Sequence, residues 1–211
     1  MVDNSTAFVK GTINNTGTIS LKSGGNGSYL QLSGNTTLTG GGKVILADSA
    51  NPQNFIFGAA ANDILTNQET IEGSGNIGNG SMGLINNGTI LANGIHSLSI
   101  QPSASGFTNN GTLQVAGSSV MRVFGGPFTN FAGTTLSGGT YNVSGTLEID
   151  QLGSTGGEIV TKKANIILNG TGSSFIDAGG KKCPLESKYQ CRRERFQYHG
   201  WPQLHYAGQL Y

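Results

Sequence analysis

Apolar and polar residues alternate in short runs over positions 1–180 of the chain. Each run is bounded by Gly, Asn or Ser. A period of two places successive side chains on opposite faces, as in a half-buried β-strand, and the flanking Asn and Gly favour turns. The pattern therefore predicts strands at Gly17–Leu21, Tyr29–Leu32, Val44–Leu46, Gly88–Leu91, Thr112–Val115, Thr140–Val143 and Thr146–Ile149.

A longer repeat accompanies these strands. An apolar residue, an Asn-rich stretch, Gly-Thr and an aliphatic residue recur as INNTGTI, INNGTI, FTNNGTL and FTNFAGTTL, with weaker copies LSGNTTL and LTNQETI. Successive final aliphatic residues are 19, 33, 19, 23 and 23 positions apart: Ile19, Leu38, Ile71, Ile90, Leu113 and Leu136. A period of about 20 residues that tolerates insertions is typical of a solenoid. We expect the longest interval, Ala47–Asp63, to leave the stack as a loop.

The recurrent Asn residues predict a second kind of contact between repeats. Stacked rungs bring equivalent residues to within about 4.8 Å, so that Asn side chains can form hydrogen-bonded ladders. Roughly eight rungs of about 22 residues each would build a rod on the order of 40 Å long.

Composition narrows the structural and functional classes. Gly supplies 35 of the 211 residues, and only 11% of residues are charged, against about 25% in ordinary domains. Gly, Asn, Ser and Thr are poor helix formers, so an all-β fold is expected. Six Lys and Arg against nine Asp and Glu give positions 1–180 a net charge of −3, which argues against nucleic-acid binding. Because no run of about 18 apolar residues occurs, we expect no transmembrane segment.

The repeats resemble those of a known architectural group. INNGTI, FTNNGTL, FTNFAGTTLSGGTYNVSGTLEI and IILNGTGSSF are similar to the right-handed parallel β-helix repeats of bacterial secreted proteins. Autotransporter passengers and filamentous-haemagglutinin-type adhesins are the groups concerned, and the similarity covers residues 8–180. It implies a right-handed parallel β-helix and a secreted or cell-surface location. It says little about activity, since such rods serve as adhesins, enzymes and inert stalks.

Residues 181–211 differ in composition from residues 1–180. They contain both Cys, the only Trp, and no Asn or Thr, and they carry a net charge of +4. One interpretation is a segment that caps the rod or binds a partner. The other is a one-base frameshift at Lys181-Lys182, because one permitted set of codons, read in a shifted frame, restores Asn, Thr and Gly. Cys183 and Cys191 would then have no selected function.

Glu148 and Asp150 form the strongest candidate for catalysis. Two residues apart on a predicted strand, they are expected to leave the same face of the sheet. Paired carboxylates there could act as acid and base on a polysaccharide or bind a cation. The competing interpretation, which we favour, is a solvated outer face that alternates with Leu147 and Ile149 inside.

The remaining titratable residues give weaker signals. Asp63, Glu69 and Glu72 form a loose acidic group near the long interval, without the spacing of a calcium-binding repeat. His96, the only His in positions 1–180, has no ligand-like partners nearby in the sequence, and we expect it in a surface turn. We therefore expect no metal site and no cofactor.

Aromatic residues fall into two groups. Phe107, Phe124, Phe128 and Phe131 are expected to stack inside the coil, with an exposed platform for sugars as the alternative. Phe55-Ile56-Phe57, in the expected loop, is the best candidate for an exposed apolar contact.

These observations favour a structural or adhesive segment of a larger secreted or cell-surface bacterial protein, and no catalysis is expected. Glycans, extracellular matrix or other cells are the expected partners, and rung edges are expected to self-associate. The alternative is a polysaccharide-degrading β-helix lyase or hydrolase that uses Glu148 and Asp150. The start of the chain does not resemble a secretory signal, so we expect an internal fragment.

Overall fold

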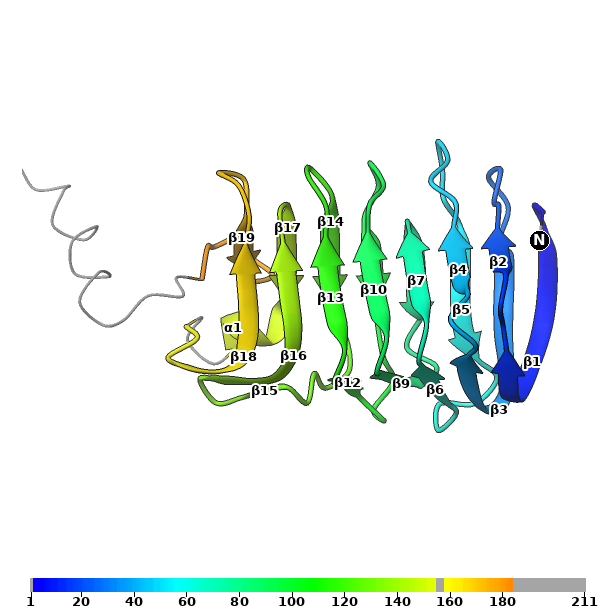
Figure 1. Cartoon of the computed structure of the whole chain (residues 1–211), viewed down its shortest axis with the longest axis horizontal. Helices are drawn as coiled ribbons and strands as arrows, with labels where there is room; N and C mark the ends of the chain where they lie inside the picture. The colour runs from blue at the N-terminus through cyan, green and yellow to red at the C-terminus, as the bar shows by residue number, and fades with distance from the viewer. Residues whose placement is uncertain (1, 155–157, 184–211) are drawn as a thin grey trace, which may run out of the picture.

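A computed structural model describes residues 2–154 and 158–183 of the chain. It is a parallel β-solenoid whose rungs stack along the long axis of the molecule (Figure 1). Each rung contributes strands to up to three faces, called the first, second and third sheets below, which together enclose a continuous apolar core; the first two are joined through β1 and β3 into one hydrogen-bonded sheet. The expected all-β parallel β-helix is therefore confirmed.

The strands of each sheet recur once per turn. The first sheet contains β1 (Ser5–Asn14), β3 (Ser28–Thr39), β5 (Asn54–Gly58), β8 (Gly75–Gly78), β11 (Leu98–Ile100), β14 (Val120–Val123), β17 (Thr146–Ile149) and β19 (Ser174–Ile176). The second sheet contains β6 (Ile64–Asn67), β9 (Gly83–Asn86) and β12 (Phe107–Asn109), and β1 and β3 extend into it. The third sheet contains β2 (Thr18–Leu21), β4 (Lys43–Leu46), β7 (Thr70–Gly73), β10 (Thr89–Ala92), β13 (Thr112–Val115), β16 (Thr135–Val143) and β18 (Thr161–Leu168).

Two short elements lie outside this plan. β15 (Phe131–Ala132) pairs antiparallel with β16, and α1 (Asp150–Ser154) follows β17 directly. Within the described residues every other pairing of named strands is parallel.

The third sheet shows seven rungs where the sequence predicts about eight. Residues in register along it are 25, 27, 19, 23, 28 and 25 positions apart: Leu21, Leu46, Gly73, Ala92, Val115, Val143 and Leu168. Most turns are longer than the period of about 20 residues that the sequence repeat indicates. Their lengths also vary, because the loops at the corners differ from one rung to the next. Two of the six predicted anchors are also wrong, since Val44 and Tyr141, not Leu38 and Leu136, are in register with Ile71 and Leu113.

The expected loop at Ala47–Asp63 contains a strand of the stack. β5 pairs with β3 on one side and β8 on the other, and Ile56 is fully buried. Ile56 belongs to an inward column of aliphatic residues, one per rung, that continues as Ile77, Ile100, Val123 and Ile149. The exposed apolar contact predicted for Phe55-Ile56-Phe57 is therefore wrong for Ile56, while both Phe rings are half-buried on the outside.

The predicted Asn ladder is present and lies inside the coil. Asn67 Nδ2 donates to Asn86 Oδ1, and Asn86 Nδ2 donates to Asn109 Oδ1, both at 2.8 Å. Asn130 extends the ladder, because its Oδ1 accepts from Asn109 N and its Nδ2 donates to Asn109 O. All four residues are buried. Their side chains satisfy backbone groups at the corner between the second and third sheets, where the chain turns.

A Gly comes shortly after the ladder Asn at this corner, because the backbones of adjacent rungs approach closely there. A Cβ on Gly88 would lie 2.1 Å from Glu69 O, and a Cβ on Gly111 would lie 2.1 Å from Gly88 O. Neither distance is compatible with a side chain, so the Gly of the Gly-Thr motif is a requirement of stacking.

Candidate functional site

Glu148 and Arg122 form an ion pair between adjacent rungs of the first sheet. Strand pairing sets Arg122 of β14 opposite Glu148 of β17. The guanidinium donates from Nε at 3.1 Å and from a terminal nitrogen at 2.8 Å, both to Glu148 Oε1. Glu148 alternates with the buried Leu147 and Ile149, as the favoured interpretation predicts, but at 9% exposure it is buried and does not lie on a solvated face.

Asp150 does not share a strand face with Glu148. β17 ends at Ile149, and Asp150 is the first residue of α1. The expectation of two carboxylates at i and i+2 of one strand is therefore wrong, because the chain turns into a helix between them. Burial raises the pKa of Asp150, and the nearby charge of Glu148 raises it further. The positive charge of Arg122 partly offsets this shift.

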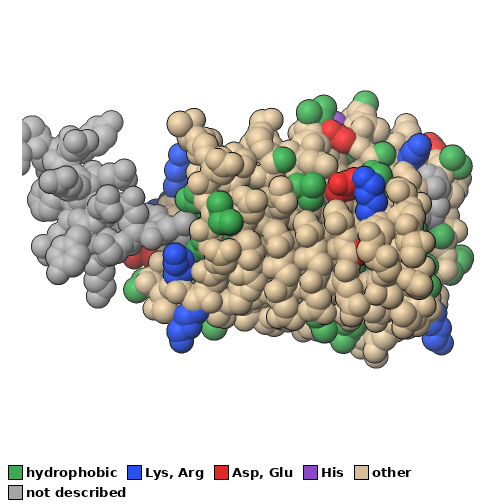
Figure 2. Space-filling model, viewed as in Figure 1, with side chains coloured by type: hydrophobic (Ala, Val, Ile, Leu, Met, Phe, Trp, Pro, Cys, Tyr) green, Lys and Arg blue, Asp and Glu red, His purple; other side chains and the backbone are tan. Residues whose placement is uncertain are grey.

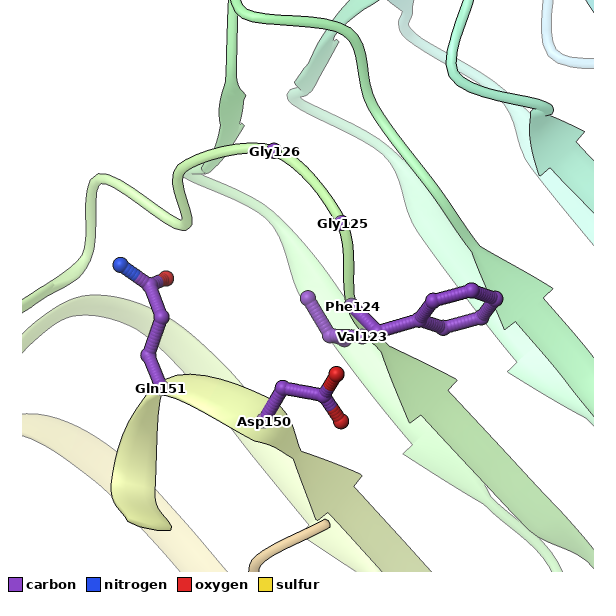
Figure 3. A pocket seen from close by; sticks show the side chains of 6 residues that line it. All are labelled: Val123, Phe124, Gly125, Gly126, Asp150 and Gln151. Atoms are coloured by element: carbon purple, nitrogen blue, oxygen red, sulfur yellow. The ribbon is translucent and has the colours of Figure 1, made fainter. Parts of the chain in front are cut away.

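A small open pocket of about 160 Å³ lies beside these residues. Asp150 and Gln151 form one side, and the chain from Val123 to Gly126 forms the other (Figure 3). The Phe124 ring extends away from this pocket, and the Arg122 guanidinium lies 5.6 Å from its centroid. Gln151 Oε1 accepts a hydrogen bond from Phe128 N at 2.5 Å, which joins α1 to the preceding rung.

This geometry limits the acid–base chemistry available. A glycosidase needs two carboxyl groups, one protonated and one ionised, that both reach the substrate. Both hydrogen bonds from Arg122 are accepted by Oε1 of Glu148, so this oxygen is already occupied. Asp150, with its raised pKa, is the member of the pair that faces the pocket.

The second acidic group, Asp63, Glu69 and Glu72, does not form one site, because each carboxylate makes its own separate contact. Asn15 Nδ2 donates to both oxygens of the buried Glu69, at 3.0 and 3.1 Å. Glu72 pairs with Lys43 Nζ at 2.9 Å on the outer face of the third sheet. Asp63 accepts from Ala60 N in a turn. Within the described ranges, no three His, Cys, Asp or Glu side chains gather as a metal site.

His96 lies in a surface turn, as predicted. Its Nδ1 is 2.7 Å from Asp48 Oδ1, and Asp48 also accepts from Ile95 N at 2.6 Å. This contact joins the corner loops of two rungs. The pKa of Asp48 is lowered overall, because burial, which raises it, is outweighed by hydrogen bonds from His96 and Ile95.

The two aromatic groups differ from expectation in opposite ways. Phe107 and Phe128 stack inside the coil at 5.1 Å between centroids, and Phe131 is buried, as predicted. Phe124 faces outward instead. Tyr29, Phe55 and Phe57 form an external cluster. The outward position of Phe55 and Phe57 agrees with the predicted apolar contact, whereas Tyr29 was not predicted to join them; its alternation with the buried Leu30 was the available signal.

Cys183 is folded against the last rung. Its backbone N–H donates to Phe175 O, and burial, followed by the charge of Asp177, raises the pKa of its thiol to about 11. Such a thiol is protonated at neutral pH and therefore unreactive. The other candidate cysteine, Cys191, and the tail hypotheses for residues 184–211 lie outside the described residues.

Comparison with known proteins gave no match: no family model, no curated protein and no solved structure aligns with this chain. No helix in the described part is both long and apolar enough to cross a membrane.

Proposed function

We propose that this chain is a structural or adhesive segment of a larger secreted or cell-surface bacterial repeat protein of the autotransporter or haemagglutinin type. The observation that carries the proposal is the unbroken stacking of rungs over a single core. Such stacking makes a stiff, extended body, because each rung is fixed by backbone hydrogen bonds to both neighbours. The proposed function of this body is to present its outer surface over an extended distance.

The outer surface supports a role in distributed contact. Figure 2 shows one long side of the rod, where charged side chains are few and scattered. On the outside of the third sheet, one column carries Thr70, Thr89, Thr112 and Thr140 on four successive rungs. Repeated weak contacts on such a surface add up by multivalency.

Attachment of beads coated with the purified chain to extracellular matrix and to intact cells tests this proposal. We expect more attachment than for beads coated with an unrelated β-rich protein, and competition by soluble chain. Attachment no better than this control would leave only the structural role, which predicts a rod of constant length by small-angle scattering. A compact or expanded particle in that measurement would contradict the structural role as well.

The enzymatic alternative draws on one observation, the raised pKa of Asp150 beside a pocket and an Arg–Glu pair. It predicts new reducing ends or unsaturated products from a polysaccharide incubated with the chain. Asp150→Asn would abolish such an activity, whereas Glu72→Gln, on the third sheet, would preserve it. Activity with this profile would replace the structural proposal.

A further inference from the structure

All solvent-facing aromatic rings in the described part of the chain lie on one face, the outside of the first sheet. They are Phe8, Tyr29, Phe55, Phe57 and Phe124. The other aromatic residues in the described ranges are buried in the coil: Phe107, Phe128, Phe131, Tyr141 and Phe175. The outer face of the third sheet, as far as the structure describes it, carries none, so the aromatic residues are segregated to one side.

Three of these rings form an organised cluster. Tyr29 stacks on Phe55 with centroids 5.5 Å apart and 20° between planes, and it meets Phe57 edge-on at 5.9 Å. Gly27 helps to place Tyr29, because a Cβ on Gly27 would lie 1.9 Å from the Tyr29 ring. Phe8, 69% exposed, lies on β1 at the edge of the same face. The rings are thus positioned before any ligand arrives.

Small uncharged side chains separate this cluster from Phe124. In register after Phe55 come Asn76 and Ser99, and then Arg122, which contacts the Phe124 ring. Gly78 follows Phe57 in the neighbouring column. Three strand spacings place the cluster about 14 Å from Arg122. Two aromatic borders therefore enclose a polar strip.

The charges on this face argue against an ionic ligand. β5, β8 and β11 carry no charged side chain. Arg122 is neutralised by Glu148. Lys10 on β1 and Asp150 on α1 lie on either side of the strip formed by β5, β8 and β11, and Lys182 lies further along, beside β19. A ligand here meets aromatic C–H surface, amides and hydroxyls.

We propose that the outer face of the first sheet binds a neutral polysaccharide across β3 to β14. Pyranose rings offer apolar C–H faces to aromatic side chains and hydroxyls to amide and hydroxyl groups, which is the chemistry that alternates along this face. The inference deepens the adhesive form of the proposed function and rests on it, since it names the ligand class and the site.

Affinity electrophoresis of the full chain through gels containing dextran, mannan or laminarin tests the proposal, with polygalacturonate as the anionic comparison. We expect retardation by at least one neutral polysaccharide and none by polygalacturonate. Phe57→Ala should weaken binding about tenfold, and Phe57→Trp should retain it. Leu91→Ala, a half-buried apolar truncation on the third sheet, is the matched control and should bind as the parent chain does.

Gly27→Ala provides a test that keeps every aromatic residue. It displaces the Tyr29 ring and should weaken binding while circular dichroism stays unchanged. Absence of retardation by all three neutral polysaccharides, or equal retardation of parent and Phe57→Ala, would overturn the site. So would retardation by polygalacturonate alone. If coated beads still attached to cells and Phe57→Ala left attachment unchanged, the adhesive proposal would stand and this site would fall.

Discussion

Buried amides hold successive rungs in register at the residue scale. Asn86, at the centre of the ladder, donates to Asn109 and accepts from Asn67, so the side chains of three successive rungs form a chain of hydrogen bonds along the axis. A buried amide that loses its partner keeps its desolvation penalty. The ladder therefore disfavours slippage of one rung against the next, which an aliphatic column alone would tolerate.

Asn86→Ala tests this ladder at its centre. The substitution removes the donor to Asn109 Oδ1 and the acceptor of Asn67 Nδ2, and we expect a loss of about 2 kcal/mol in unfolding free energy. Urea denaturation provides the measurement. Asn87→Ala is the control, because Asn87 is exposed and its side chain accepts from Asn110 at the surface; its cost should stay within about 0.5 kcal/mol. Equal costs for the two variants would contradict the role of the ladder.

The carboxyl group of Glu69 makes stability depend on pH. Burial raises its pKa above 4.5 in the folded chain, and the Asn15 hydrogen bond only partly opposes this shift. The folded state thus binds the proton more tightly, so stability is highest below the unfolded pKa and declines as pH rises through the window up to the folded pKa.

Glu69→Gln removes this titration and should flatten the decline. We expect the variant to be more stable than the parent at neutral pH, with the advantage gone at low pH, where the parent carboxyl is protonated. Thermal unfolding followed from low to neutral pH measures the difference. Glu72→Gln is the control, since Glu72 is paired with Lys43 on the outer face. A stability difference between Glu69→Gln and the parent that did not change with pH would refute the assignment.

Glycine placement is decided at the scale of the strand pair. Gly88→Ala would bring a methyl group against Glu69 O on the previous rung, and we expect it to cost about 2 kcal/mol. Gly17 precedes the equivalent strand of the first rung, and a Cβ there has no heavy atom within 4 Å. Gly17→Ala should therefore be tolerated. Denaturation midpoints of the two variants check the contrast, which a similar midpoint would contradict.

The sequence predicts the period of the elements better than their register. Alternation correctly places strands and inward residues, because it reflects local burial. It misplaces Leu38, since LSGNTTL imitates the repeat unit while β3 continues through a corner and sets Leu38 against Asn67. Which corner a motif occupies depends on the neighbouring rung, and that information is not local.

The candidate site shows the same limit. Alternation indicates that Glu148 faces outward, but its partner Arg122 is 26 positions away and meets it only through strand pairing. Similarly, Tyr29 and Phe55 are distant in sequence and become neighbours only by stacking. Predicting contacts along the solenoid axis requires the length of each turn, and that length is not constant, because the corner loops differ from one rung to the next.

The ends of the rod decide how whole molecules interact. Inward residues of the intermediate rungs are buried, whereas Ala7, Val9, Ile13 and Ile19 at one end, and Ala164 and Ile166 at the other, are only partly buried. The core is thus open toward the first rung, where β1 presents an unpaired edge in the described structure. Backbone groups and apolar side chains exposed together favour edge pairing with a second copy.

We expect the chain to self-associate through this edge. Sedimentation velocity should show an apparent mass that rises with concentration. The double substitution Thr6→Lys and Thr12→Lys, at exposed positions of β1, should shift the population toward monomer by repulsion between facing edges. The control, Thr89→Lys with Thr112→Lys on interior strands of the third sheet, should leave association unchanged. A parent chain that stayed monomeric at all concentrations would show that the partly buried residues of the first rung are stable without a partner.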